Sequence, residues 1–154
     1  DTLTKSAVAE AKRIRGRGAE PFAKNDEVWA VFDVDEHPNF HNAVQRCKDN
    51  GVGVGRSNPC FELWLILHWE DYDKGDGRRT VQERCQQVCP GYDKDSKTLD
   101  CTNLFQNVEA AIKRAEDQLA RRKDQDNEFG CPSTTVGSLV QAILGAAARY
   151  RRGG

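Results

Sequence analysis

The stretch Val28–His37, with the sequence VWAVFDVDEH, decides the fold that we expect for this chain. Its first five residues are apolar, and a short run of this kind that ends in polar residues is typical of a strand buried on both faces. Such strands belong to parallel sheets, whose two faces are covered by helices. The stretch therefore predicts a parallel α/β sheet that contains a strand at residues 27–32.

Two carboxylates, Asp33 and Asp35, follow this strand directly. Because residues i and i+2 of a strand point to the same side, both should project from its carboxyl end, where open α/β sheets bind their ligands. Mg²⁺ or Mn²⁺ would offset their mutual repulsion, since both ions prefer oxygen ligands. The structural alternative is that Asp35 or Glu36 caps a helix that begins near Pro38. The apolar run and the adjacent Glu36 and His37 favour the metal site.

Hydrophobic periodicity predicts further elements on both sides of this stretch. Helices are expected at 2–15 and 38–49, and a second strand at 52–56. This order implies parallel pairing of the strands through crossover helices. The helices expected after the second strand are at 60–69, 79–89, 104–124 and 133–149. We therefore expect one domain, in which residues 1–70 form the α/β core and residues 71–154 form a helical extension packed on it.

Glu62 is an unusual residue in its predicted helix. The helix at 60–69 is apolar on nearly all sides, which is typical of a helix in the core. A buried carboxylate is costly unless it is paired or bound to a metal ion. Glu62 is therefore a candidate site residue, with an exposed helix edge or a capping contact as the structural alternative. Before it, Asn58 is expected to cap the helix and Pro59 to open its first turn.

The overall composition limits the class of protein. The 154 residues carry a net charge of −1, so no global basic field indicates nucleic-acid binding. No apolar run reaches transmembrane length and no signal peptide is visible, which favours a cytoplasmic protein. The six cysteines show no Cys-x-x-Cys spacing, so we expect reduced thiols. Methionine is absent and the chain opens within a predicted helix, so we expect part of a longer gene product.

Four segments together have a pattern that resembles a known family. They are Asp33–Asn39 (DVDEHPN), Ser57–His68 (SNPCFELWLILH), Pro90–Lys94 (PGYDK) and Pro132–Thr135 (PSTT). In this order they resemble the RloB-like family, which is found beside bacterial restriction–modification and abortive-infection genes. The resemblance spans almost the whole chain, and Ser57–His68 is its most specific part.

This resemblance implies a Toprim fold, a Rossmann-like domain that holds Mg²⁺ and makes or breaks phosphodiester bonds. Asp33 and Asp35 match its metal-binding pair, and Glu62 matches the glutamate of the specific segment. All three are expected as metal ligands and catalytic residues, and His37 is a further catalytic candidate. The expected substrate-binding residues are Lys94, Arg56 and Asn58. Family members begin with a strand and a Glu-Gly-x-x-Thr-Glu segment, so the N-terminal strand is expected to be missing here and the chain to be catalytically incomplete.

The resemblance, together with the candidate metal ligands, implies a Mg²⁺-dependent nuclease in phage defence. Asp33 and Asp35 would hold the metal and His37 would act as general acid or base. Nearby basic residues would supply a local positive field for nucleic acid: Arg56, Arg78, Arg79 and Lys94. The expected substrate is nucleic acid, and the resemblance implies an ATPase partner, because family members often stand beside an ATPase gene. A second copy of the chain or an N-terminal fragment of the same protein is a further expected partner.

Two other functions remain open from the sequence. Haloacid dehalogenase-like phosphatases also have Asp-x-Asp after an apolar strand, and Ser57 resembles their next motif. That class has Thr or Val where His37 stands, however, and it needs further strands downstream, where residues 80–149 are expected to be helical. The non-enzymatic alternative is a regulatory module that binds the ATPase and needs neither metal nor intact carboxylates.

Overall fold

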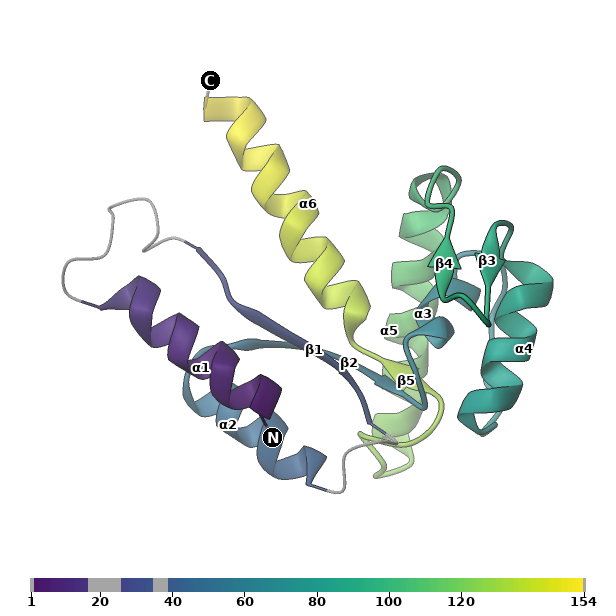
Figure 1. The fold of residues 1–154 in the computed structure, drawn as a ribbon, viewed down its shortest axis with the longest axis horizontal. Coiled ribbons are helices and arrows are strands. Elements are labelled where there is room, and N and C mark those ends of the chain that lie inside the picture. Colours follow the sequence, from purple (N-terminus) through teal and green to yellow (C-terminus); the bar gives the residue numbers. More distant parts are fainter. Residues whose placement is uncertain (1, 17–25, 35–38, 154) are drawn as a thin grey trace.

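The computed structural model describes residues 2–16, 26–34 and 39–153 of the chain. The elements in chain order are α1 (Thr2–Arg15), β1 (Trp29–Asp33), α2 (Phe40–Asp49), β2 (Gly53–Asn58), α3 (Glu62–Ile66), α4 (Arg78–Val88), β3 (Tyr92–Asp93), β4 (Thr98–Leu99), the 3-10 helix η2 (Phe105–Asn107), α5 (Val108–Asp124), β5 (Ser133–Thr134) and α6 (Val136–Gly153). The predicted α/β class, with a parallel strand pair followed by a helical C-terminal half, is confirmed (Figure 1).

The central sheet is mixed, not parallel throughout. β1 and β2 pair in parallel as predicted, with Trp29 beside Gly53 and Asp33 beside Ser57. β5 pairs antiparallel with the other edge of β2, which gives the strand order β1-β2-β5. The sequence predicted a helix start at Ser133–Thr134 instead, because a strand of two residues is too short to show a period-two pattern.

β1 is buried on one face only, so the prediction of burial on both faces was wrong. Ala30 and Phe32 are buried in a cluster with residues of α1 and α2, whereas Val31 on the opposite face is 40% exposed. β1 lies at the edge of the three-stranded sheet. α6 contacts β2 and then extends away from the sheet, which leaves the β1 side of this face partly open (Figure 1).

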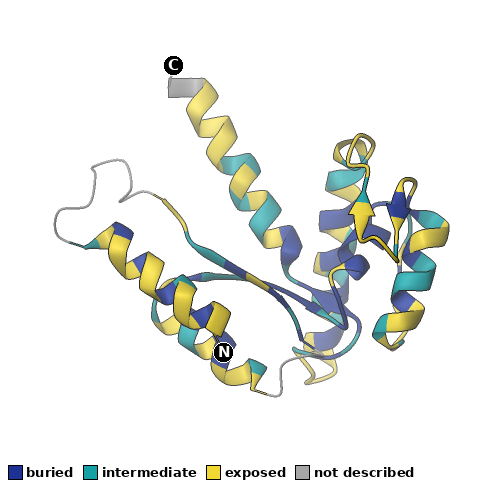
Figure 2. Ribbon diagram, viewed as in Figure 1, coloured by how far each residue is buried: buried dark blue, intermediate teal, exposed yellow. Residues whose placement is uncertain are grey.

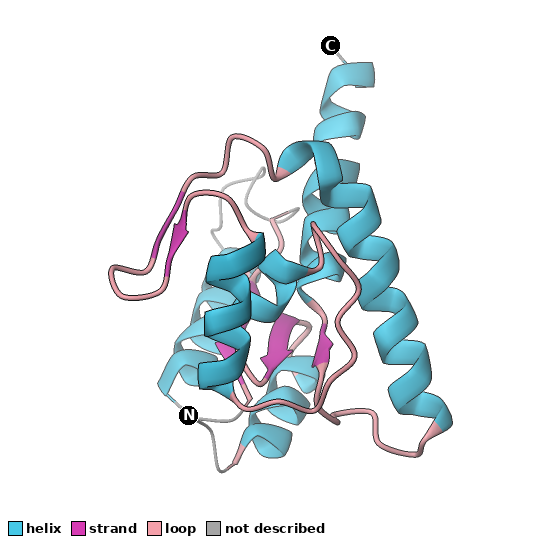
Figure 3. Cartoon of the chain, turned by 90° about the vertical axis from the view of Figure 1, so that its right-hand side faces the viewer, coloured by secondary structure: helices cyan, strands magenta, loops and turns pink. Residues whose placement is uncertain are grey.

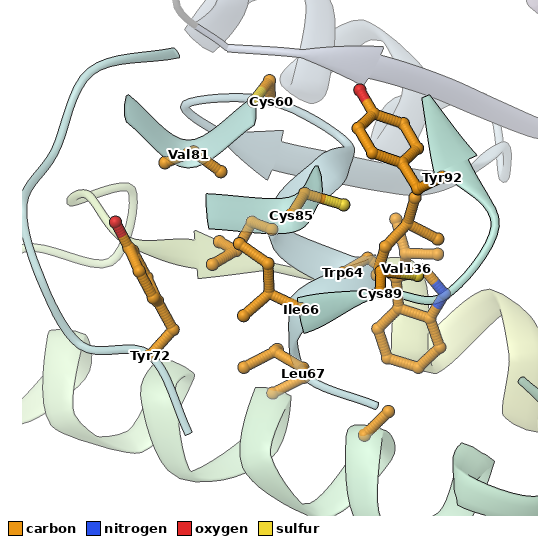
Figure 4. Close-up of a cluster of buried hydrophobic side chains, with 14 of the residues drawn as sticks. Cys60, Trp64, Ile66, Leu67, Tyr72, Val81, Cys85, Cys89, Tyr92 and Val136 are labelled. Atoms are coloured by element: carbon orange, nitrogen blue, oxygen red, sulfur yellow. The ribbon is translucent and has the colours of Figure 1, made fainter. Parts of the chain in front are cut away.

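The apolar side chains form two clusters. The first joins α1, α2, β1 and the residue before β2, and consists of Val8, Ala11, Ala30, Phe32, Val44, Cys47 and Val52. The second joins α3, α4, α5 and the β3–β4 hairpin, and includes Leu63, Trp64, Ile66, Leu67, Val81, Cys85, Tyr92 and Ala111 (Figure 4). α3 is buried along its whole length, as Figure 2 shows, and packs with the helical half of the chain.

Local structure around α3 and α4 differs from the prediction in three places. The helix at 60–69 is shorter, because α3 ends at Ile66 and turns follow to residue 69. Asn58 pairs with Ser133 in the sheet and does not cap α3, whose start has no side-chain cap. Residues 91–102, where no helix or strand was expected between the predicted helices at 79–89 and 104–124, contain the β3–β4 hairpin, which stands out from the body in Figure 3.

Two bulk properties can be compared with the sequence. None of the helices in the described part of the chain is long and apolar enough to cross a membrane. All six cysteines are free thiols, and the buried ones are Cys47, Cys60, Cys85 and Cys89. The two clusters thus use cysteine as a small apolar side chain.

Candidate functional site

Asp33, the last residue of β1, lies at the carboxyl end of the parallel pair. Its Oδ2 lies 3.1 Å from Nη1 of Arg78, the first residue of α4, and its side chain is only 23% exposed. Burial raises the pKa of Asp33, the charge of Arg78 lowers it, and the nearby charge of Glu62 raises it again. Because burial and a neighbouring acid both penalise its ionisation, an additional cation would stabilise the charged form of Asp33.

Glu62, the first residue of α3, holds a second carboxylate in the same region and is 7% exposed. Its Oε1 accepts hydrogen bonds from Nε2 of Gln82 at 3.2 Å, the hydroxyl of Tyr92 at 2.7 Å and Nζ of Lys97 at 2.8 Å. Burial alone would raise the pKa of Glu62, but hydrogen bonds from Lys97, Tyr92 and Cys60 hold that pKa at about 2. Glu62 is therefore a fixed anion at neutral pH.

The β3–β4 hairpin delivers two of these donors to Glu62. Tyr92 is in β3, and Lys97 is in the connecting turn with a φ of 55°, in the left-handed region. Gly91 precedes the hairpin with a φ of 76°, and a Cβ atom there would lie 2.6 Å from the Cβ of Asp100. Only glycine satisfies both conditions at this position. The geometry of the hairpin therefore depends on Gly91, and the position of Lys97 depends on the hairpin.

A row of polar residues continues from Asp33 across the sheet. Ser57 is its neighbour on β2, and Ser57 Oγ lies 2.9 Å from Oγ1 of Thr134 on β5. The Ser57 carbonyl also accepts a hydrogen bond of 2.8 Å from the backbone N–H of Val34. Ser57 and Thr134 are both fully buried, so their hydroxyl groups do not face solvent. The row instead holds in place the end of the strand that carries Asp33.

The structure brings together two of the predicted acids. Glu62 is close enough to Asp33 for its charge to raise the pKa of Asp33. Burial, and after it the charges of Glu62 and Asp33, raise the pKa of the Cys60 thiol. The predicted residues Asp35 and His37 lie outside the described residues. Among the residues that the structure describes, no group of three or more His, Cys, Asp or Glu side chains is arranged to hold a metal ion.

Two of the predicted substrate-binding residues, Arg56 and Asn58, make hydrogen bonds within the fold. Arg56 is buried, and its Nη1 and Nη2 donate to Oγ of Ser133 at 2.9 Å and to the carbonyl of Glu128 at 2.7 Å. Burial lowers the pKa of Arg56 to about 10. Asn58 Nδ2 donates to the carbonyl of Phe129 at 2.8 Å. Through these hydrogen bonds the two side chains attach β2 to β5 and to the segment before it.

The site contains residues that the sequence prediction missed. Lys94 is partly exposed in the turn of the hairpin, whereas Lys97, three residues later, reaches Glu62. Tyr92 lies inside the segment Pro90–Lys94 that carried part of the resemblance, so its neighbourhood was a usable signal. Gln82 of α4, which donates to Glu62, was missed as well. Arg78 was expected as part of a local positive field but not as the partner of Asp33. Neither residue has a distinctive local pattern, since both are polar residues of an amphipathic helix.

The depressed pKa of Glu62 predicts how stability depends on pH. Because its pKa falls from 4.5 to about 2 on folding, its contribution is present above pH 4.5 and is lost as the pH falls through about 2. The difference corresponds to about 3 kcal/mol at most. We expect chemical denaturation of the unmodified protein to show a fall in unfolding free energy from pH 5 to pH 2 that is steeper than in Glu62→Gln.

The exposed Glu109→Gln on α5 is the matched control, because it removes a carboxylate that stands in solvent. Its pH profile should run parallel to that of the unmodified protein. Identical pH profiles for Glu62→Gln and the unmodified protein would mean that Glu62 is not held as a stabilised anion.

A protein-family model described as RloB-like protein matches residues 1–143 of the chain. The match includes both hydrophobic clusters and all strands of the central sheet, and it ends within α6. No curated protein and no solved structure matches the chain.

Proposed function

Since the chain belongs to the RloB-like protein family, we propose that it is a Mg²⁺-dependent nuclease with a Toprim-type site, which cleaves phosphodiester bonds in bacterial defence against phages. The observation that carries this proposal is one constellation at the carboxyl end of the parallel pair. There Asp33 is paired with Arg78, and Glu62 is paired with Lys97. Two acids beside two cations suit a reaction that must bind a cation and an anionic phosphate at one place.

Asp33 fits a metal ligand better than Glu62 does. Burial and the charge of Glu62 disfavour ionisation of Asp33, and a bound Mg²⁺ would relieve that cost. Oε1 of Glu62 already accepts three hydrogen bonds, which leaves it poorly suited to direct coordination. We therefore assign the metal to Asp33 with Asp35 two residues later, and give Glu62 the role of positioning Lys97. Bound Mg²⁺ would neutralise charge on the phosphate and lower the pKa of a coordinated water.

The two cations have the properties of phosphate-binding groups. The side chain of Lys97 is 50% exposed, so its ammonium can meet a ligand from solvent while it stays near Glu62. Arg78 offers a planar guanidinium, which suits bidentate contact with phosphate oxygens. In this proposal both cations turn from their carboxylates to the scissile phosphate when substrate and metal bind. His37 remains the candidate general acid or base, and an ATPase remains the proposed partner.

Metal dependence tests the proposed function directly. We expect cleavage of end-labelled DNA, RNA or tRNA by the protein, together with its ATPase partner, when Mg²⁺ or Mn²⁺ is present. EDTA should lower the rate by at least about 100-fold, because the metal supplies several kcal/mol of charge stabilisation. Excess Mg²⁺ should restore the rate.

Two outcomes would contradict the proposal. Cleavage that persists in EDTA would exclude a metal-dependent reaction. Stable binding to the ATPase without cleavage of any of the three nucleic acids would favour the regulatory module. Phosphate release from a monoester, with a trapped aspartyl-phosphate on Asp33, would favour the phosphatase.

A further inference from the structure

A groove of about 650 Å³ lies on the opposite edge of β2 from β1 and is separate from the site described above. It runs between α2 and the C-terminal part of α5, and the segment that precedes β5 closes one side. Its lining residues include neither Asp33 nor Glu62, and neither of the cations paired with them. The volume is typical of pockets that bind small molecules.

The walls of the groove are mainly apolar, with two aromatic rings. Trp29 and Phe129 contribute the rings, and the aliphatic walls come from Val44, Val52, Val54, Leu119 and Ala120. The ring of Trp29 lies over Gly53, where a Cβ atom would come 2.3 Å from the indole, so the glycine is required for this ring position. Flat apolar walls of this kind suit a planar ring.

The charged residues that line the groove are mostly basic. Lys48 and Lys123 are exposed, and within the described part of the chain neither ammonium group has an ion-pair partner. Arg56 also lines the groove, but its guanidinium is buried and donates to Oγ of Ser133 and the carbonyl of Glu128. Glu128 is the acidic residue of the lining. The two exposed ammonium groups of Lys48 and Lys123 outnumber the single carboxylate of Glu128, so the open part of the lining favours an anion.

The edge of β2 adds a backbone donor to this surface. The backbone N–H of Gly53 donates to the carbonyl of Val28 on the β1 side. In a strand, the backbone polar groups of successive residues point to opposite edges, so those of Val54 point away from β1. The Val54 carbonyl accepts from Oγ1 of Thr135 at 2.7 Å. Its N–H points to the same side, where Val54 lines the groove.

We propose that this groove binds an anionic ligand with a planar aromatic ring, of the purine mononucleotide class. The base packs against the apolar walls beside Trp29, and the phosphate lies toward Lys48 and Lys123. This chemistry has two sources, a free mononucleotide or one nucleotide of a nucleic-acid strand. The proposal does not depend on nuclease activity, because the groove and the Asp33 site share no residue.

Isothermal titration with 5′-AMP and 5′-GMP tests the proposal on the full chain. We expect saturable binding to the unmodified protein and to Asp33→Asn alike, with quenching of the fluorescence of Trp29. Ala120→Trp, which fills the groove from the exposed side of α5, should weaken binding at least 10-fold. The double variant Lys48→Ala/Lys123→Ala should do the same by removing the positive charge.

Matched controls separate these effects from general changes in charge or surface. Ala147→Trp on the exposed side of α6 and the double variant Lys12→Ala/Lys74→Ala alter residues that do not line the groove, and both should bind as the unmodified protein does. Adenosine should bind more weakly than 5′-AMP, because it lacks the phosphate.

Binding of a ten-nucleotide strand but not of 5′-AMP would assign the groove to one nucleotide of a strand; binding of 5′-AMP would assign it to a free nucleotide. Failure of all these ligands to bind would overturn the proposal. Equal binding in Ala120→Trp and in the lysine variant would overturn it as well.

Discussion

Replacing Asp33 with asparagine is expected to lower the metal-dependent nuclease rate at least about 100-fold, with little change in the thermal midpoint. The substitution keeps the shape of the side chain but removes the charge that would hold the metal. Because burial disfavours the ionised form of Asp33, removing its charge costs the folded state little, even though the ion pair with Arg78 is lost. A rate loss of this size corresponds to about 2.7 kcal/mol of transition-state stabilisation.

Titration with Mn²⁺ should accompany the rate measurement. The unmodified protein should bind Mn²⁺ weakly, as expected for two carboxylates that leave most of the coordination shell to water, and the double variant Asp33→Asn/Asp35→Asn should not bind it. Asp26→Asn, at an exposed residue before β1, is the matched control and should keep both properties. Equal Mn²⁺ binding in the double variant and the unmodified protein would place the metal elsewhere.

Replacing Glu62 with alanine is expected to lower the free energy of unfolding by about 2–4 kcal/mol at pH 7. The variant leaves the buried hydroxyl of Tyr92 without its acceptor and removes the anion that holds Lys97. Unsatisfied buried polar groups cost about 1–3 kcal/mol each, whereas Lys97, being half exposed, can regain water. In the structure Glu62 is therefore the anchor of the hairpin.

A double-mutant cycle distinguishes anchoring from a general loss of packing. Glu62→Gln and Tyr92→Phe should each destabilise the protein, and the double variant should lose less than the sum of the two, because both remove the same hydrogen bond. Glu109→Gln, on the exposed side of α5, should leave the free energy of unfolding within about 0.5 kcal/mol of the unmodified protein. Strictly additive losses would show that the two residues do not interact.

The exposed face of β1 could cause the protein to associate in solution. Val31 is 40% exposed at the edge strand, and exposed apolar edge strands promote association. The sequence led us to expect that the chain pairs with an N-terminal segment or self-associates through this strand. Sedimentation of the protein alone and with its ATPase partner should therefore precede the rate measurements.

The sequence by itself determined the elements that local periodicity encodes. The helix at Thr2–Arg15 and the parallel pairing of the two central strands follow from apolar spacing and from helix–strand order. The same reasoning placed Asp33 at a strand end and Glu62 in a buried helix, because a carboxylate stands out in an apolar run. Each of these inferences needs only residues that are close together in the chain.

Only the tertiary structure decided which residues meet at the site. Lys97 reaches Glu62 from 35 residues away, and Arg78 of α4 reaches Asp33 at the end of β1. Arg56 donates to Oγ of Ser133, which is 77 residues later. Such contacts depend on the packing of α3, α4 and the hairpin around a shared core, and no local pattern in the chain specifies which polar side chain of an amphipathic element will lie opposite a given acid.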